Sequence, residues 1–350
     1  MATLSYHEQE DKRIYKKMHE FADELPPFCR TFFTGIEPRT QARTRLAYAY
    51  DLSIFFSYLK HENPLYKDYE LRDFTLDDVS NVSVHDLEEY MEYLKYRPDD
   101  EDGEIANKEN GIKRKISSLK SFYRYLYENE MIEKNPAALV KLPKIHSKDI
   151  IRLDYNEVAR LLDEADTGEQ LTKQQKAFHE KTRKRDLAIL SLLLGTGMRI
   201  SECIGIDLKD IDLEETAVRI HRKGGKEETV YFSDEVADVL QQYIEERKTA
   251  LPEAGHEQAL FLSLQNKRMS VRSAELMVKK YAQIVTPLKH ITPHKLRSTY
   301  GTHLYQETGD IYLVADVLGH SDVNTTKKHY AAIDEDRRRM ARSAVKLRED

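Results

Sequence analysis

The stretch Thr292-Pro-His-Lys-Leu-Arg297 decides the architecture of the C-terminal part of this chain. A threonine suits the residue that precedes a helix, and a proline suits the first helical position. His294 and Arg297 then fall three residues apart in the first turns, a spacing that places two side chains on one helix face. The stretch therefore predicts a helix whose beginning presents an imidazole and a guanidinium together.

Further polar residues follow this helix at short intervals. Residues 314–318 predict a helix end closed by Gly319, so His320 is expected at a helix junction. A new helix is predicted from Ser321 through Tyr330. Residues 292–330 thus carry two histidines, an arginine and a tyrosine that suit one polar site.

A second arginine lies upstream, after a run of apolar residues. Residues 186–194 predict a buried helix, which Gly195-Thr-Gly197 ends, so that Arg199 begins a fresh helix and can face a cleft. Glu202 has two interpretations. It either orients Arg199 or His294 through a hydrogen bond, or lies solvated on the helix surface.

Between these segments, residues 217–232 predict a β-hairpin. Two runs that contain β-branched and aromatic residues flank Gly224-Gly225, which is a turn signal. Lys223 is expected at the tip, where a flexible lysine can reach the minor groove of a DNA duplex. Lys226, three residues further on, is the alternative lysine for this contact, and Lys223 is favoured.

These residue types suit the cleavage of a phosphodiester by a tyrosine. An exposed phenol has a pKa near 10, so only about 0.1 % is ionised at pH 7, and full ionisation costs roughly 4 kcal/mol. The pentavalent phosphorus that follows gathers negative charge on its non-bridging oxygens, which planar guanidinium groups match with paired donors. The leaving oxygen also needs a proton, which a nearby lysine or histidine supplies as general acid.

Six residues in this order resemble the catalytic signature of the tyrosine site-specific recombinases of the phage integrase family. They are Arg199, Lys223, His294, Arg297, His320 and Tyr330. The sequences Arg-Lys-Gly-Gly-Lys and Thr-Pro-His-Lys-Leu-Arg are most similar to the Xer branch, in its single-recombinase form. The match spans about residues 185–333, and residues 116–126 weakly resemble the end of the family's core-binding domain.

The resemblance implies a role for each member of this set. Tyr330 attacks the scissile phosphate and forms a 3′-phosphotyrosyl link, while the two arginines hold the phosphate oxygens. His294 serves as base or proton relay, His320 donates a hydrogen bond to the phosphate, and Lys223 protonates the leaving oxygen. Because the link retains the phosphodiester bond, religation needs no ATP, cofactor or metal.

The resemblance also implies a mainly α fold with a small β-sheet, arranged as a C-shaped clamp. It divides the chain into a helical, SAM-like core-binding domain at residues 1–140, a linker at 141–152 and a catalytic domain at 153–350. The implied partners are double-stranded DNA with a specific inverted-repeat site and three further protomers in a tetramer on two sites. Whether accessory proteins are needed as well stays open on the sequence alone. A C-terminal helix is predicted at residues 334–347. It docks either on a neighbouring protomer or on the protomer to which it belongs.

Two departures from the family pattern stand out. Ser298 follows Arg297 where many relatives carry a second histidine, which removes one contact and leaves the roles above unaffected. Residues 163–184 are longer and more charged than in short Xer proteins, which predicts an inserted helix or loop. Streptococcal-type single Xer recombinases have a similar extension, and an integrase of a mobile element stays the alternative.

Composition sets the outer limits. The 350 residues, 40 % of them hydrophobic, are enough for two globular domains. No apolar run approaches the length of a membrane span, and the N-terminal residues lack the features of a signal peptide, so a cytoplasmic, nucleoid-associated protein is expected. Cys29 and Cys203 predict no disulfide framework. The histidines form no Cys/His cluster, so no metal site is expected.

The net charge of −6 is unfavourable for a nucleic-acid binder, because affinity for DNA comes largely from neutralising phosphates. The distribution of charge matters more than its total, and basic residues cluster along the helices expected to face DNA. The residues expected to bind DNA are Arg43, Arg45, Lys113, Arg114, Lys115, Lys120, Arg124 and Lys226. A solvated helix face is the alternative for each cluster.

The N-terminal part predicts a small helical bundle. Apolar side chains recur at helical spacing over residues 46–59 and 112–126, and a charged helix is predicted over residues 7–25. Tyr123 and Tyr125 are expected in the core of this bundle rather than stacked on DNA.

Two other functions stay open on the sequence alone. A type IB topoisomerase shares the tyrosine, arginine and lysine chemistry but rejoins the same strand. A non-catalytic DNA-binding accessory protein would retain the pocket without using it. For a recombinase, the biological outcome is chromosome-dimer resolution, or integration and excision of a mobile element.

Overall fold

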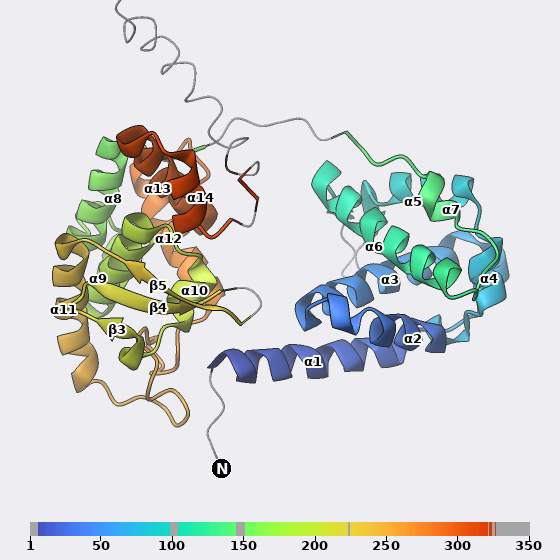
Figure 1. Cartoon of the computed structure of the whole chain (residues 1–350), viewed down its shortest axis with the longest axis horizontal. Coiled ribbons are helices and arrows are strands. Elements are labelled where there is room, and N and C mark those ends of the chain that lie inside the picture. The colour runs from blue at the N-terminus through green and yellow to red at the C-terminus, as the bar shows by residue number, and fades with distance from the viewer. Residues whose placement is uncertain are drawn as a thin grey trace, which may run out of the picture. The chain divides into compact units, whose positions relative to one another are not determined.

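The structure is a computed structural model that describes residues 6–98, 104–144, 151–222, 225–320, 322–323 and 326. The chain divides into two compact units, residues 1–148 and 149–350. Helices dominate both units, and the strands form two small sheets (Figure 1). The expected fold class, mainly α with a small β-sheet, is therefore confirmed. Neither unit holds, among its described residues, a helix long and apolar enough to cross a membrane.

The first unit is a bundle of helices with one short hairpin. Its helices are α1 (Tyr6–Glu24), α2 (Pro27–Gly35), α3 (Ala42–Glu62), α4 (Leu76–Asn81), α5 (Val84–Tyr93), α6 (Glu109–Glu128) and α7 (Pro136–Leu139). Strands β1 (Tyr96–Pro98) and β2 (Glu104–Ala106) pair antiparallel. The apolar stripes predicted over residues 46–59 and 112–126 lie on α3 and α6, so both helices are confirmed.

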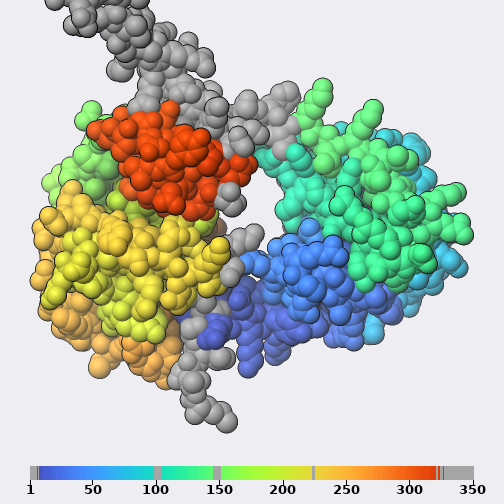
Figure 2. Space-filling view, in the orientation of Figure 1, coloured from blue at the N-terminus to red at the C-terminus, as the bar shows by residue number. Residues whose placement is uncertain are grey.

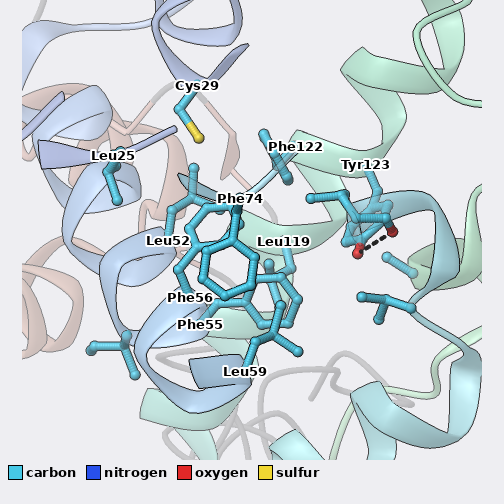
Figure 3. Close-up of a cluster of buried hydrophobic side chains, with 14 of the residues drawn as sticks. Leu25, Cys29, Leu52, Phe55, Phe56, Leu59, Phe74, Leu119, Phe122 and Tyr123 are labelled. Carbon is cyan, nitrogen blue, oxygen red and sulfur yellow. Dashed lines mark hydrogen bonds between the residues drawn. The ribbon is translucent and has the colours of Figure 1, made fainter. Parts of the chain in front are cut away.

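Aromatic rings fill the core of this unit (Figure 3). Phe122 reaches Phe56 edge to face with 6.4 Å between ring centroids, and Phe56 reaches Phe74 at 5.2 Å. Each fully buried ring contributes about 1.5 to 3 kcal/mol. The Tyr123 hydroxyl donates to the Val79 carbonyl at 3.1 Å, so its expected core position is confirmed. These contacts fix α3 and α6 against each other.

The second unit combines helices with a three-stranded sheet. Its helices are α8 (Tyr155–Thr167), α9 (Lys173–Thr196), α10 (Ile200–Gly205), α11 (Asp234–Thr249), α12 (Val271–Val285), α13 (Pro293–Thr308) and α14 (Ile311–Val317). The sheet joins β3 (Ile211–Asp212), β4 (Ala217–His221) and β5 (Glu227–Tyr231) in that order. Both pairs are antiparallel, so the hairpin predicted around Gly224-Gly225 is confirmed.

Helix α9 is much longer than the buried helix predicted over residues 186–194, which forms only its C-terminal part. Residues 163–184, predicted as an inserted helix or loop, form the end of α8, a turn at Gly168 and the beginning of α9. His179 in this part is buried, with its Nδ1 3.0 Å from the Tyr281 hydroxyl. The charged segment therefore packs into the unit.

The two cysteines are buried, free thiols. Cys29 lies in α2 and Cys203 in α10, so the two belong to different units. Burial raises the pKa of both thiols, which keeps them protonated. They serve as small apolar core residues.

Candidate active site

Arg297 lies at the centre of the candidate site, on the buried face of α13. This helix begins after Thr292 with Pro293 at its first position, as predicted. Arg297 is only 4 % exposed. Its Nη1 donates to the Gly197 carbonyl at 2.6 Å, and its Nη2 donates to the Leu318 carbonyl. These two main-chain bonds hold the guanidinium in place between Gly197 and Leu318.

This one side chain joins three segments that are far apart in the sequence. Gly197 stands two residues before Arg199, and Leu318 stands two residues before His320. Because Arg297 bonds to both carbonyls, the structure brings the two arginines and His320 to one region of the second unit. In the space-filling view, the orange-red surface of residues 293–320 borders the yellow surface that follows β4 (Figure 2).

Arg199 is held by a buried carboxylate. It is the residue that precedes α10, and its amide donates to Glu202 Oε2 at 2.7 Å. Its Nη1 donates to Glu202 Oε1 at 2.8 Å. The Glu202 side chain is 4 % exposed and that of Arg199 is 40 % exposed. Glu202 therefore orients Arg199, and the interpretation of Glu202 as a solvated surface carboxylate is wrong.

His320 occupies the turn that follows α14. The helix ends at Val317, and Gly319 adopts a left-handed φ of +59°, as its predicted closing role requires. The His320 amide donates to the Ala315 carbonyl at 2.9 Å, and its Nδ1 lies 2.7 Å from the Thr326 hydroxyl oxygen. The contact through Nδ1 fixes the rotation of the ring and hence the direction of Nε2.

His294 lies exposed in the first turn of α13, one turn before Arg297. The Ser298 hydroxyl donates to the His294 carbonyl at 3.0 Å. The side chain of Ser298, the residue that departs from the expected family pattern, therefore bonds to its own helix.

Two members of the expected catalytic set lie outside the described residues: Lys223 and Tyr330. Their roles stay predictions. The two ends of the hairpin turn are described, and the Arg222 amide donates to the Lys226 carbonyl at 2.7 Å. Lys226 is exposed, so the choice between it and Lys223 stays open.

The residues expected to bind DNA differ widely in exposure. The exposed ones are Arg43, Arg114, Arg124 and Lys226, and the partly exposed ones are Lys113 and Lys120. Arg45 and Lys115 are buried. Arg45 Nη1 donates to the Thr40 carbonyl at 2.7 Å, and Lys115 Nζ donates to Asn107 Oδ1 at 2.9 Å. A DNA contact by either buried residue would require these internal bonds to break.

Two of the more accessible residues also bond within the first unit. Arg114 donates through both terminal nitrogens to the two carboxylate oxygens of Asp51, each at 2.7 Å. Lys120 Nζ donates to the Val140 carbonyl at 2.7 Å. A basic residue in the sequence can therefore bond within the protein as well as face solvent. The contacts with DNA stay predictions.

Sequence patterns did not indicate a structural role for Arg222, the residue that follows β4, although its side chain reaches the end of α14 next to the candidate site. Its side chain is 8 % exposed, and its Nη2 donates to the Val317 carbonyl at 2.9 Å. The signal lies in the alternation of the strand, because Val218 and Ile220 are buried and residue 222 continues their face. A charged residue at such a position usually has an internal partner.

Comparison with known proteins defines the class. The model of the phage integrase family matches residues 152–337. Tyrosine recombinase XerC of Caldanaerobacter subterraneus subsp. tengcongensis is 31 % identical over 344 residues, which cover 94 % of this chain and 90 % of that protein. XerD of Staphylococcus epidermidis is 33 % identical over 75 % of this chain and 82 % of its own length. XerS of Lactococcus lactis subsp. cremoris is 28 % identical, with coverages of 93 % and 98 %.

Solved structures share the fold. The Tn1549 transposon integrase in complex with transposon right end DNA superposes with a TM-score of 0.64 at 23 % identity, covering 91 % of this chain and 99 % of that chain. XerH bound to palindromic difH substrate gives 0.62 at 19 % identity, with coverages of 86 % and 79 %. The chain belongs to the phage integrase family. It is a tyrosine recombinase, an enzyme that cuts and rejoins DNA in site-specific recombination.

Proposed function

We propose that this recombinase binds double-stranded DNA and cleaves it through Tyr330. The phenolic oxygen forms a bond to the scissile phosphorus, the bond from phosphorus to the 5′ oxygen breaks, and the products are a 3′-phosphotyrosyl link and a free 5′-hydroxyl. The observation that carries the proposal is the pair of carbonyl bonds from Arg297 to Gly197 and Leu318. These bonds gather residues from three segments around one position for a phosphate.

The charges of the site suit the transition state. Arg199 and Arg297 place two permanent cations where the non-bridging oxygens gain negative charge, and their positions are fixed before the substrate arrives. His294 takes the phenolic proton directly or through a relay, and His320 donates to the phosphate. Lys223 gives its proton to the leaving 5′ oxygen. In the reverse direction a 5′-hydroxyl attacks the phosphotyrosine and the phenol is released.

We propose further that the target is an inverted-repeat site and that four protomers join two such sites. Chromosome-dimer resolution is the first candidate for the biological outcome, in line with the similarity of the chain to recombinases of the Xer branch. Integration or excision of a mobile element is the alternative outcome, and accessory proteins are proposed partners in either case. Residues 1–140 are assigned to core binding and residues 153–350 to catalysis, with residues 141–152 as the linker of a clamp around DNA.

Recombination of a plasmid tests this proposal. A supercoiled plasmid carries two candidate inverted-repeat sites from the source genome in direct orientation, and a matched plasmid carries one intact and one scrambled site. We expect two smaller circles from the first plasmid and none from the second or with Tyr330→Phe. Relaxation of both plasmids without circles would support a topoisomerase. Binding to both intact sites without cleavage would support an accessory DNA-binding protein.

A further inference from the structure

Arg222 connects the hairpin of the second unit to the turn that carries His320. Its side chain is almost completely buried, although a guanidinium loses strong hydration when it leaves water. Its Nη2 donates to Glu228 Oε1 at 2.7 Å and to the Val317 carbonyl at 2.9 Å. Its Nε lies 2.5 Å from Glu228 Oε2. The first partner belongs to β5 and the second to the end of α14, so the contact joins two elements.

The end of α14 is a favourable place for a cation. The last carbonyls of a helix lack partners within the helix and carry partial negative charge. Arg222 bonds to the carbonyl of Val317, and Arg297 bonds to the next carbonyl, that of Leu318. Two guanidinium groups from two different elements thus hold successive carbonyls of one turn. The position of that turn depends on both.

Gly319 makes room for this contact. It has a left-handed φ of +59°, and a Cβ atom there would overlap the Arg222 guanidinium. The next residue, His320, has its amide bonded to the Ala315 carbonyl. The guanidinium therefore packs directly against the residue before His320.

The backbone of Arg222 also forms hydrogen bonds across the base of the turn between β4 and β5. The Arg222 amide donates to the Lys226 carbonyl at 2.7 Å, and its own carbonyl accepts from the Gly225 amide at 3.2 Å. Lys223 is the next residue in the sequence. Since the backbone of Arg222 closes the turn and its side chain holds α14, the origin of the turn is fixed relative to the His320 segment.

We propose that Arg222 is a positioning residue for the proton transfer to the leaving oxygen. It anchors the start of the Lys223 turn against α14, so that Lys223 and His320 address the same scissile phosphate. This inference rests on the general-acid role proposed for Lys223. Loss of the anchor widens the range of positions open to residue 223 and lowers the fraction of complexes in which the proton is delivered.

The test compares two leaving groups. One nicked duplex carries the ordinary scissile phosphate, and its partner carries a 5′-bridging sulfur, whose thiolate leaves without a proton. The variants are Arg222→Ala, Arg222→Lys and Lys223→Ala. Arg219→Ala is the matched control, because Arg219 lies on β4, which ends just before Arg222, and pairs with Asp210 at 3.2 Å. The rate of covalent-complex formation is measured for each combination.

We expect Arg222→Ala to lose about ten- to a hundredfold in rate on the oxygen duplex and less than about threefold on the sulfur duplex. Arg222→Lys should lose less than Arg222→Ala on oxygen, since it keeps the charge, and it supplies the same comparison if the alanine variant fails to fold. Lys223→Ala should lose activity on oxygen and regain it on sulfur. Arg219→Ala should match wild type on both.

The outcomes separate this inference from the function on which it rests. Equal losses by both Arg222 variants on the two duplexes, or no loss on oxygen, overturn the inference while Lys223→Ala is still restored by sulfur. A Lys223→Ala variant that sulfur does not restore overturns the acid role of Lys223, and the inference falls with it.

Discussion

Glu202 determines where the Arg199 guanidinium points. It is outside the family signature, yet it is buried and bonds to both the amide and the guanidinium of Arg199. The sequence spacing alone permitted this contact, since residues three apart on a helix start can meet. The spacing could not exclude a solvated Glu202, because the burial of this side chain depends on how the whole unit packs.

Replacing Glu202 by Gln should slow cleavage about a hundredfold, because one acceptor oxygen becomes an NH₂ group and the guanidinium loses its fixed direction. Affinity for the duplex should stay within about twofold. The measurement is covalent-complex formation on a nicked duplex beside equilibrium binding to the same duplex. Glu245→Gln is the control. Glu245 is exposed and forms a surface ion pair with Lys248, whose Nζ lies 2.8 Å from Glu245 Oε1. A Glu202→Gln rate equal to wild type contradicts the orienting role.

Arg114 gives a second single-residue prediction. Its partner Asp51 is fully buried and also accepts from the Ser118 hydroxyl at 2.6 Å. Arg114→Ala removes the guanidinium that bonds to both oxygens of this buried carboxylate. The first unit should lose about 2 to 3 kcal/mol, somewhat less than for a wholly buried pair because Arg114 is half exposed.

Hydrogen exchange of peptides from α3 and α6 in the full chain measures this loss. Arg124→Ala on the same helix is the matched control and should change stability by less than about 0.5 kcal/mol. If Arg114→Ala weakens DNA binding but leaves exchange in α3 and α6 unchanged, Arg114 acts on DNA and not on the fold.

The helices differ in how well the sequence pattern predicts them. Apolar side chains recur at helical spacing in both α3 and α6, so both helices were predictable, although α3 also buries Ile54, Phe55 and Tyr58 outside that spacing. The charged first half of α9 carries no comparable stripe, and its helical state depends on contacts such as that of His179 with Tyr281. The convergence of Arg199, Arg297 and His320 depends on main-chain carbonyls, which no side-chain pattern records.

The end of α9 should be sensitive to a single methyl group. Gly197 has a φ of +65°, and a Cβ there would overlap the Tyr300 ring and lie 2.8 Å from a Leu318 methyl carbon. Gly197→Ala should lower the free energy of unfolding of the second unit by about 2 to 4 kcal/mol, through left-handed strain and overpacking together. Chemical unfolding of the full chain, monitored by hydrogen exchange of peptides from α9 and α13, measures this loss of stability.

Gly225 provides the matched control for this prediction. Its φ is +76°, and no atom of the described residues lies within 4 Å of the added carbon. Gly225→Ala should therefore cost only the left-handed strain, about 1 kcal/mol. Equal losses for the two variants would show that overlap with Tyr300 and Leu318 contributes nothing.

The complete enzyme should work without a metal ion or nucleotide. The two arginines supply the charge that a metal ion provides in other phosphoryl-transfer enzymes, and the phosphotyrosyl link conserves the bond that religation needs. No group of three metal-ligating side chains occurs in the described part of the chain. Cleavage and strand joining should proceed at the same rate in excess EDTA. A loss in EDTA that Mg²⁺ restores would contradict a purely protein-based site.

The most direct measurement is to identify the residue that becomes attached to DNA. Nicked duplexes built from candidate sites, which trap the cleaved state, are incubated with wild type, Tyr330→Phe and Tyr312→Phe. The last is a matched control, because Tyr312 is exposed on α14. Denaturing gels should show a covalent protein–DNA band with wild type and Tyr312→Phe but not with Tyr330→Phe, and peptide mapping should place the nucleotide on Tyr330. A band with Tyr330→Phe, or a nucleotide mapped to any other tyrosine, would contradict Tyr330 as the nucleophile.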